Sequence, residues 1–295
     1  MSKNAEMYEA IANKIIAMLD NGIIPWQKPW DAESEAPRNI VSRKAYRGIN
    51  VWLLAFNSYS SPYWGTFNQI SGKGGTIKRG EKATKIYYYS FVRKLALDEK
   101  GKPVLNEKGE KVYNQYPMLK EYNVFNLDQC TGLEIAKPEK VAKSENEKIE
   151  ICENIWVNYA NRPSLSHGGD RAFYRSSEDA IRMPEFNSFI SGEAYYSTLF
   201  HEMGHSTGHA SRLKRELGNM FGSEKYGREE LIAEFSSAYL CAVAGIKKEI
   251  ENSAAYIQSW CKAIKNDPAM IMICASKAQK ASDHILGIKE NEEEN

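Results

Sequence analysis

The residues with the clearest chemical potential in this 295-residue chain form one short run, His201-Glu202-Met203-Gly204-His205. On a helix, His201 and His205 lie one turn apart on the same face, so both imidazoles can bind one metal ion at about 2 Å. Glu202 lies beside the first histidine, where a carboxylate can take a proton from a metal-activated water molecule. The run predicts a zinc metallopeptidase of the HExxH type, with one Zn²⁺ per chain, His201 and His205 as ligands, and Glu202 as the catalytic base.

A catalytic zinc site also needs a third protein ligand and an open position. The metzincin spacing would place a third histidine at position 211, but that residue is Ser211, and His209 comes two residues too early. A downstream carboxylate is therefore expected. Glu230 and Glu234 lie one helical turn apart beside an apolar stripe, where buried acids need a partner. We assign Glu230 as the third ligand and Glu234 as the carboxylate that orients an imidazole; the reverse assignment stays open.

Two helices must position these residues. Apolar side chains at helical spacing predict one helix over residues 192–207 and another over 228–245. Gly204, inside the first, costs about 1 kcal/mol relative to alanine, so we expect another backbone to approach closely there. Residues 172–174 and 179–183 predict two short strands. We expect a substrate peptide to pair with the second, Ala180–Met183, as an edge strand.

The N-terminal half combines basic and aromatic residues. Residues 1–140 hold 21 Lys and Arg against 15 Asp and Glu, an excess of +6, whereas residues 141–295 have an excess of −5. Single-stranded DNA is bound by a positive groove with aromatic faces on which bases stack. Ordinary core packing would explain many of the same aromatic residues. The candidate DNA contacts are Trp26, Lys28, Trp30, Arg38, Arg43, Lys44, Tyr46, Arg47, Lys78, Arg79 and Lys82.

Composition and patterning predict a cytoplasmic α+β protein of two domains. Apolar residues make up 42% and charged residues 26%, and no apolar stretch approaches the roughly 20 residues that span a bilayer. A charged segment over residues 136–148 is the expected linker. We expect residues 1–140 to form a mixed α/β domain, and residues 141–295 to form a mainly helical domain with a short β-sheet that carries the metal site.

The expected elements of the N-terminal half follow from the same patterns. Helices are predicted over residues 8–20, 49–57 and 64–71, and strands over residues 83–92 and 122–127. Residues 95–117 contain two turn sequences, Asp98-Glu99-Lys100-Gly101 and Asn106-Glu107-Lys108-Gly109, and predict a solvated β-hairpin excursion.

Several blocks of sequence, spread over both halves, form a recognisable series: 24–30 (IPWQKPW), 37–39 (PRN), 46–50 (YRGIN), 75–82 (GTIKRGEK), 122–129 (YNVFNLDQ), 179–184 (DAIRMP), 195–202 (YYSTLFHE) and 229–234 (EELIAE). In this order they resemble the ArdC-type antirestriction proteins of conjugative plasmids and phages. This resemblance implies an N-terminal domain that binds single-stranded DNA, a C-terminal zincin-like metallopeptidase domain, and a role in shielding incoming DNA from host restriction. The 95–117 hairpin departs from it as a variable insertion.

Three hypotheses remain open from the sequence. In the first, the protein binds single-stranded DNA and acts through zinc on a protein substrate of the host restriction system. In the second, it only binds single-stranded DNA, and its zinc site is structural or inactive. In the third, it is an unrelated cytosolic metallopeptidase whose N-terminal half recruits protein substrates.

Overall fold

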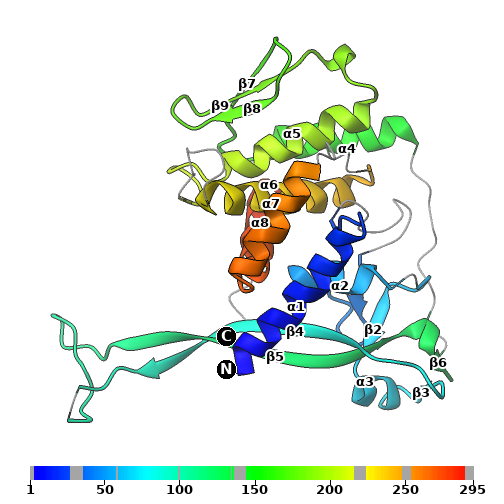
Figure 1. Cartoon of the computed structure of the whole chain (residues 1–295), viewed down its shortest axis with the longest axis vertical. Helices are drawn as coiled ribbons and strands as arrows, with labels where there is room; N and C mark the ends of the chain where they lie inside the picture. Colours follow the sequence, from blue (N-terminus) through cyan, green and yellow to red (C-terminus); the bar gives the residue numbers. More distant parts are fainter. Residues whose placement is uncertain are drawn as a thin grey trace.

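The computed structural model describes residues 3–26, 36–57, 59–98, 100–133, 135, 144–215, 224–247 and 254–289. The N-terminal half contains helices and a sheet, and the C-terminal half is mainly helical (Figure 1). The α+β fold class predicted from the sequence is therefore confirmed. The helices are α1 Lys3–Asp20, α2 Ile49–Ala55, α3 Phe67–Ser71, α4 Glu145–Asn158, α5 Gly192–Ser206, α6 Glu224–Ala244, α7 Ala254–Asn266 and α8 Met270–Leu286.

The main sheet of the N-terminal half has four strands in the order β1-β2-β5-β4. Its two long strands, β4 and β5, pair antiparallel along their whole length and project from the body as an arm (Figure 1). The arm ends in the two predicted turns, where Gly101 and Gly109 adopt positive φ. The strands of this half are β1 Arg38–Asn39, β2 Tyr63–Gly65, β3 Thr76–Ile77, β4 Thr84–Leu95, β5 Tyr113–Asn126 and β6 Cys130–Thr131.

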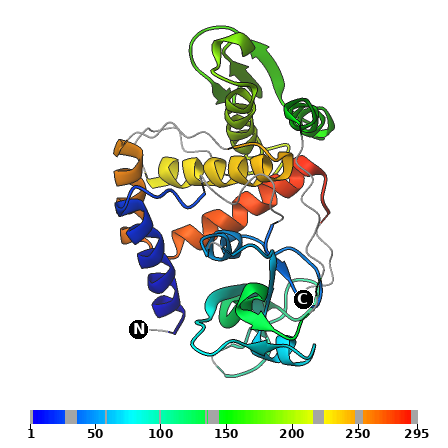
Figure 2. The same cartoon turned by 90° about the vertical axis from the view of Figure 1, so that its right-hand side faces the viewer.

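The C-terminal half places a small sheet over a group of helices. Strands β7 Ser164–His167, β9 Ala180–Met183 and β8 Phe173–Arg175 form this sheet in that order, and it lies above α5 (Figures 1 and 2). Helix α6 runs between α5 and α8 (Figure 2). Apolar residues of α4, α5, α6, α8 and the small sheet share one core.

The larger core joins the two halves of the chain. Helix α1 lies beside α7 (Figure 2), and residues of α1, α2, β4 and β5 pack with residues of α6, α7 and α8. Arg47 also forms an ion pair with the buried carboxylate of Asp283 on α8, and the amide of Gly48 donates to Gln279 Oε1 at 3.2 Å. This core contains residues from both sides of position 140. The division into two domains at that position stays a prediction.

Trp26 is a correction to the predicted DNA contacts. Its side chain is fully buried, with its ring 4.7 Å from that of Phe235 on α6 and 5.3 Å from that of Trp260 on α7. A tryptophan enclosed in this way has no free face for a base. It anchors the irregular segment after α1, and it does so against the C-terminal helices.

Two further expectations were wrong. The predicted helix over residues 64–71 is a strand followed by a one-turn helix, because Thr66 caps α3 through its side chain. Strand β9 is central and not at an edge: β7 pairs with one side of it in parallel and β8 with the other in antiparallel. A substrate peptide therefore cannot add to Ala180–Met183, and β7 and β8 form the edges of this sheet.

Candidate metal centre

Helix α5 holds the two histidines in a fixed orientation. Ser191 caps its first turn by accepting a hydrogen bond from the amide of Ala194 at 3.0 Å. A stripe of Leu199, Phe200 and Met203 is almost completely buried. Because that stripe fixes the rotation of the helix, His201 and His205 face α6.

Gly204 allows the two helices to meet closely. A Cβ atom placed there would lie 3.0 Å from Cα of Ala233 and 3.1 Å from Cβ of Ser236, both on α6. Backbone cannot move aside as a flexible side chain can, so a larger residue here would have to push the two helices apart by a few tenths of an ångström. The close backbone approach expected at this position is confirmed, and it brings the carboxylates of α6 within reach of the imidazoles of α5.

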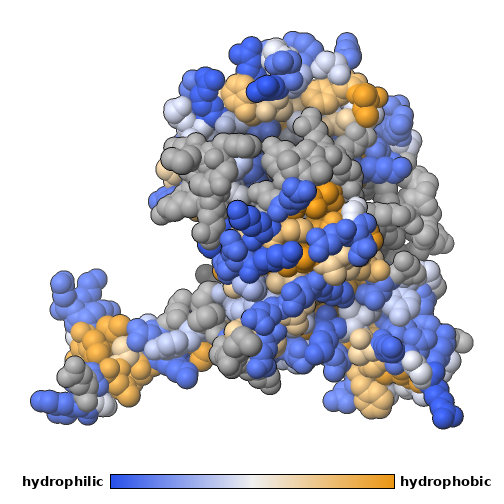
Figure 3. All heavy atoms as spheres, in the orientation of Figure 1, coloured by the Kyte–Doolittle hydropathy of each residue, from blue (hydrophilic) through white to orange (hydrophobic). Residues whose placement is uncertain are grey.

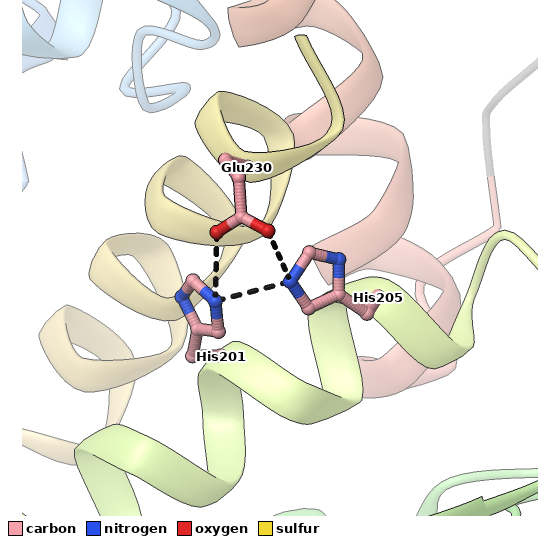
Figure 4. A group of neighbouring side chains, drawn as sticks. All are labelled: His201, His205 and Glu230. Atoms are coloured by element: carbon pink, nitrogen blue, oxygen red, sulfur yellow. Dashed lines mark hydrogen bonds and ion pairs between the residues drawn. The ribbon is translucent and has the colours of Figure 1, made fainter. Parts of the chain in front are cut away.

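The structure brings together His201, His205 and Glu230 (Figure 4). The two Nε2 atoms lie 3.1 Å apart. One oxygen of Glu230 lies 3.6 Å from Nε2 of His201, and the other lies 3.5 Å from Nε2 of His205. Tetrahedral ligands at zinc bond lengths are separated by about 3.3 Å. These three donor groups therefore fit one divalent cation without rearrangement of the helices.

Two more carboxylates contact the far side of the imidazoles. Glu234 Oε1 lies 3.1 Å from Nδ1 of His201, and Glu229 Oε1 lies 3.6 Å from Nδ1 of His205. Glu229 is itself bonded to Arg215 through Nε at 3.0 Å and Nη2 at 2.6 Å. Carboxylates in such positions orient metal-binding imidazoles and make them better donors. Glu230 thus faces the Nε2 atoms, whereas Glu234 faces an Nδ1 atom.

The electrostatics of the cluster favour a cation. Burial alone lowers the pKa of His201, but hydrogen bonds with Glu230 and Glu234 outweigh it and raise that pKa to about 10. Burial alone raises the pKa of Glu229 and of Glu230. The combined effect of His205 and Arg215 on Glu229, and of the two histidines and Tyr226 on Glu230, outweighs burial and lowers both pKa values. Counting the almost fully buried Glu202, four carboxylates surround two imidazoles, and one of these carboxylates is paired with Arg215. A divalent cation would offset the remaining negative charge.

A second buried arginine holds the end of α5 against the small sheet. The side chain of Arg212 is completely enclosed. It donates to the carbonyl of Ser206 at 2.8 Å, to that of Asn161 at 2.7 Å, and to both carboxylate oxygens of Asp179. Asp179 adopts a positive φ before β9, so this arginine fixes both the helix end and the strand entry.

Sequence reasoning missed Arg212, Arg215 and Glu229. Spacing could have suggested Glu229, which directly precedes Glu230, but nothing in the sequence indicated which carboxylate an arginine in the intervening segment would meet. Two other histidines contact hydroxyl groups away from the three candidate ligands. His167 Nε2 is 2.8 Å from the hydroxyl of Tyr195, and His209 Nδ1 is 2.8 Å from the hydroxyl of Ser211.

The predicted DNA contacts occupy separate places. Lys28 and Trp30 lie outside the described residues. The guanidinium of Arg47 is engaged with Asp283, as described above. Four others lie on β1 or in the loop that follows it, where a pocket of about 280 Å³ is lined in part by Lys44 and Tyr46. The four near β1 are Arg38, Arg43, Lys44 and Tyr46, and the three exposed cations between β3 and β4 are Lys78, Arg79 and Lys82.

Comparison with known proteins adds a family to this geometry. Residues 5–125 match the N-terminal domain of the anti-restriction factor ArdC, and residues 156–277 match a zincin-like metallopeptidase family. The metal-free structure of the ArdC protein of plasmid R388 has a TM-score of 0.74 and 32% identity, covering 95% of this chain and 97% of that one. The chain belongs to the ArdC antirestriction family. The Mn(II)-bound R388 ArdC structure also has a TM-score of 0.74, with 33% identity over 97% of this chain and 99% of that one.

Other ArdC-like sequences occur as parts of longer proteins. Two DNA primases TraC from Escherichia coli are 38% and 37% identical to 99% and 97% of this chain. The chain spans only 20% and 27% of their lengths. The uncharacterized protein y4eC of Sinorhizobium fredii (strain NBRC 101917 / NGR234) is 33% identical, over 94% of this chain and 91% of its own length. No helix in the described ranges of the chain combines the length and hydropathy needed to cross a membrane.

Proposed function

We propose that this ArdC-family protein binds single-stranded DNA and carries a zinc-dependent metallopeptidase-like site, and that it protects incoming plasmid or phage DNA from restriction in the host cytoplasm. The observation that carries the enzymatic part is the convergence of two Nε2 atoms and the Glu230 carboxylate at distances suited to one cation. Its substrate would be a protein of the host restriction system.

His201, His205 and Glu230 are the ligands in this proposal, and Glu234 orients His201. Zinc is the metal best suited to two imidazoles and a carboxylate on a zincin-like domain. The related R388 ArdC protein has a structure with bound Mn(II), which supports a divalent ion but leaves room for a metal other than zinc. Metal analysis of the purified protein decides between them.

The reaction is peptide hydrolysis. A divalent metal in this site supplies a Lewis acid that polarises a substrate carbonyl and lowers the pKa of a water molecule. Glu202, which follows His201 on α5, takes a proton from the attacking water and gives it to the leaving amine. Its side chain is only 7% exposed, so the proton transfer takes place away from bulk solvent. Glu229 and Arg215 hold the ring of His205 in place.

Metal content is the first test. We expect about one zinc ion per chain in the wild type, loss of that ion in a His201→Ala, His205→Ala double variant, and retention in Glu202→Gln. Stoichiometric metal in the double variant would reject the ligand assignment. Glu202→Gln is the matched control, because it keeps the shape and the ligands while it removes the proton acceptor.

Activity and DNA binding are tested separately. Glu202→Gln should abolish any proteolysis of host restriction proteins while zinc content is unchanged. Anisotropy of a labelled oligonucleotide should report binding that weakens steeply as salt is added. The competing proposal, a DNA-binding protein whose metal site is structural or inactive, predicts that Glu202→Gln protects incoming DNA as well as the wild type does.

A further inference from the structure

The projecting arm carries an exposed aromatic row that none of the predicted DNA contacts includes. Strands β4 and β5 pack against α1 and α2 near the body and then project beyond it as this arm, with apolar side chains near its far end (Figures 1 and 3). Side chains on a face of the two strands that nothing covers bury little surface, so exposed rings there contribute little to folding. Their presence needs another explanation.

The register of the arm separates its residues into two faces. Side chains of directly paired residues lie on the same face of an antiparallel ladder, and alternate residues of a strand share a face. Tyr88 pairs with Lys120, Tyr122 with Ile86, and Tyr116 with Val92. All six positions are even-numbered and belong to one face. The opposite face carries Tyr87 and Leu119, which are buried in the core with α1 and α2.

Three tyrosines on the even-numbered face are open to solvent. Tyr88 is 42% exposed, Tyr116 is 49% exposed and Tyr122 is 44% exposed. Tyr88 and Tyr122 are diagonal neighbours, which places them about 7 to 8 Å apart. Tyr116 lies four residues further along the ladder from Tyr88, about 13 Å away. The row therefore covers about 20 Å along the arm.

The charge of this face matches a polyanion. Lys94 and Lys120 are exposed on it, and Nζ of Lys94 lies 5.7 Å from the ring centre of Tyr116. Within the two strands, whose even-numbered residues are all described, this face has no Asp or Glu. The odd-numbered face differs, because Glu121 lies there and pairs with Lys85 at 3.1 Å.

We propose that Tyr88, Tyr116 and Tyr122, with Lys94 and Lys120, form a stacking platform for single-stranded DNA. This inference rests on the proposed DNA-binding function and locates it on the arm. Unpaired bases present the flat faces that exposed tyrosine rings can stack against, whereas bases in a duplex are stacked on each other. The lysines contact phosphates and give no base preference.

The surface near β1 can extend this platform. Tyr46 packs against the small core of Leu54, Trp64, Ile86 and Val124. Ile86 pairs with Tyr122, and Val124 follows two residues later on the same face. The exposed cations Arg43 and Lys44 precede Tyr46 in the same loop. A strand of DNA that leaves Tyr122 toward the body of the protein would thus meet further positive charge.

Binding of a fluorescently labelled oligodeoxythymidylate to the full chain tests the platform. Replacing one tyrosine by alanine should weaken binding at least about fivefold, and replacing all three should weaken it about 100-fold or more. The triple phenylalanine variant keeps the rings and should bind within about threefold of the wild type. Tyr113→Ala is the matched control, because Tyr113 is 52% exposed on the same arm but on the opposite face.

The lysines give a second readout. We expect the double variant Lys94→Ala, Lys120→Ala to bind with a weaker salt dependence. The plot of the logarithm of the binding constant against the logarithm of the salt concentration should become less steep by about 1.4, because each phosphate contact on a single strand contributes about 0.7. If the wild type binds the oligonucleotide and the triple alanine variant binds it with the same affinity, the platform is overturned but the proposed DNA-binding function is not. A wild type that fails to bind at low salt would overturn both.

Discussion

Replacing Glu230 and Glu234 separately by glutamine distinguishes a metal ligand from a carboxylate that orients one. Both side chains are on α6, one turn apart, and both are mostly buried at 15% and 12% exposure. Their positions relative to the imidazoles differ: Glu230 faces both Nε2 atoms at 3.5 and 3.6 Å, and Glu234 faces Nδ1 of His201 at 3.1 Å. The substitutions are matched in size, so a difference in metal binding reflects position.

The expected magnitudes follow from these roles. Loss of a carboxylate behind a ligating imidazole costs about 10- to 100-fold in metal affinity, or about 1.4 to 2.7 kcal/mol. We expect that loss for Glu234→Gln. Glu230→Gln removes one of three protein ligands and should weaken zinc binding by more than 100-fold. Competition with a chelating dye at fixed pH measures both values. A larger loss in Glu234→Gln than in Glu230→Gln would refute this assignment and favour the reverse one.

Three substitutions test the framework around the site. Trp26→Ala should destabilise the protein by about 3 to 5 kcal/mol and lower Tm by about 5 to 8 °C in calorimetry, because the ring is fully buried. Gly204→Ala should lower the urea midpoint despite better helix propensity, since its Cβ meets Cα of Ala233 at 3.0 Å; a higher midpoint would contradict the close approach. Asp179→Asn tests pH dependence: burial alone raises the pKa of Asp179, but Arg212 and Tyr174 hold it below its unfolded value. The ionised carboxylate of Asp179 therefore stabilises the fold above about pH 4, and this effect is lost as pH falls further. The difference in free energy of unfolding between wild type and variant, measured by urea titration, should shrink in acid.

The sequence predicted best where local rules and packing agree. The helices that hold His201, His205, Glu230 and Glu234 lie where apolar periodicity indicated, and the cost of Gly204 correctly signalled a close backbone. These features depend on spacing within a single helix, which the sequence states directly.

Features set by long-range pairing were harder to predict. Residues 180–183 have the same alternation in a central strand as in an edge strand, so only the pairing partners show that β9 lies between β7 and β8. Trp26 beside prolines suits a stacking surface and a buried anchor equally well. Arg215 and Glu229 are 14 residues apart with no periodic relation, and only the fold brings them together.

Helix α6 explains why the N-terminal half of the chain and the candidate metal centre form one body. On one side it presents Glu230 and Glu234 to the histidines of α5. On another, Phe235 packs against Trp26, and the ring of Tyr239 stacks 4.8 Å from that of Trp52. The helix that carries Glu230, the proposed third ligand, is therefore held in place by aromatic residues of the N-terminal half. The geometry of the metal centre depends on both halves of the chain, although all of its donor groups come from one.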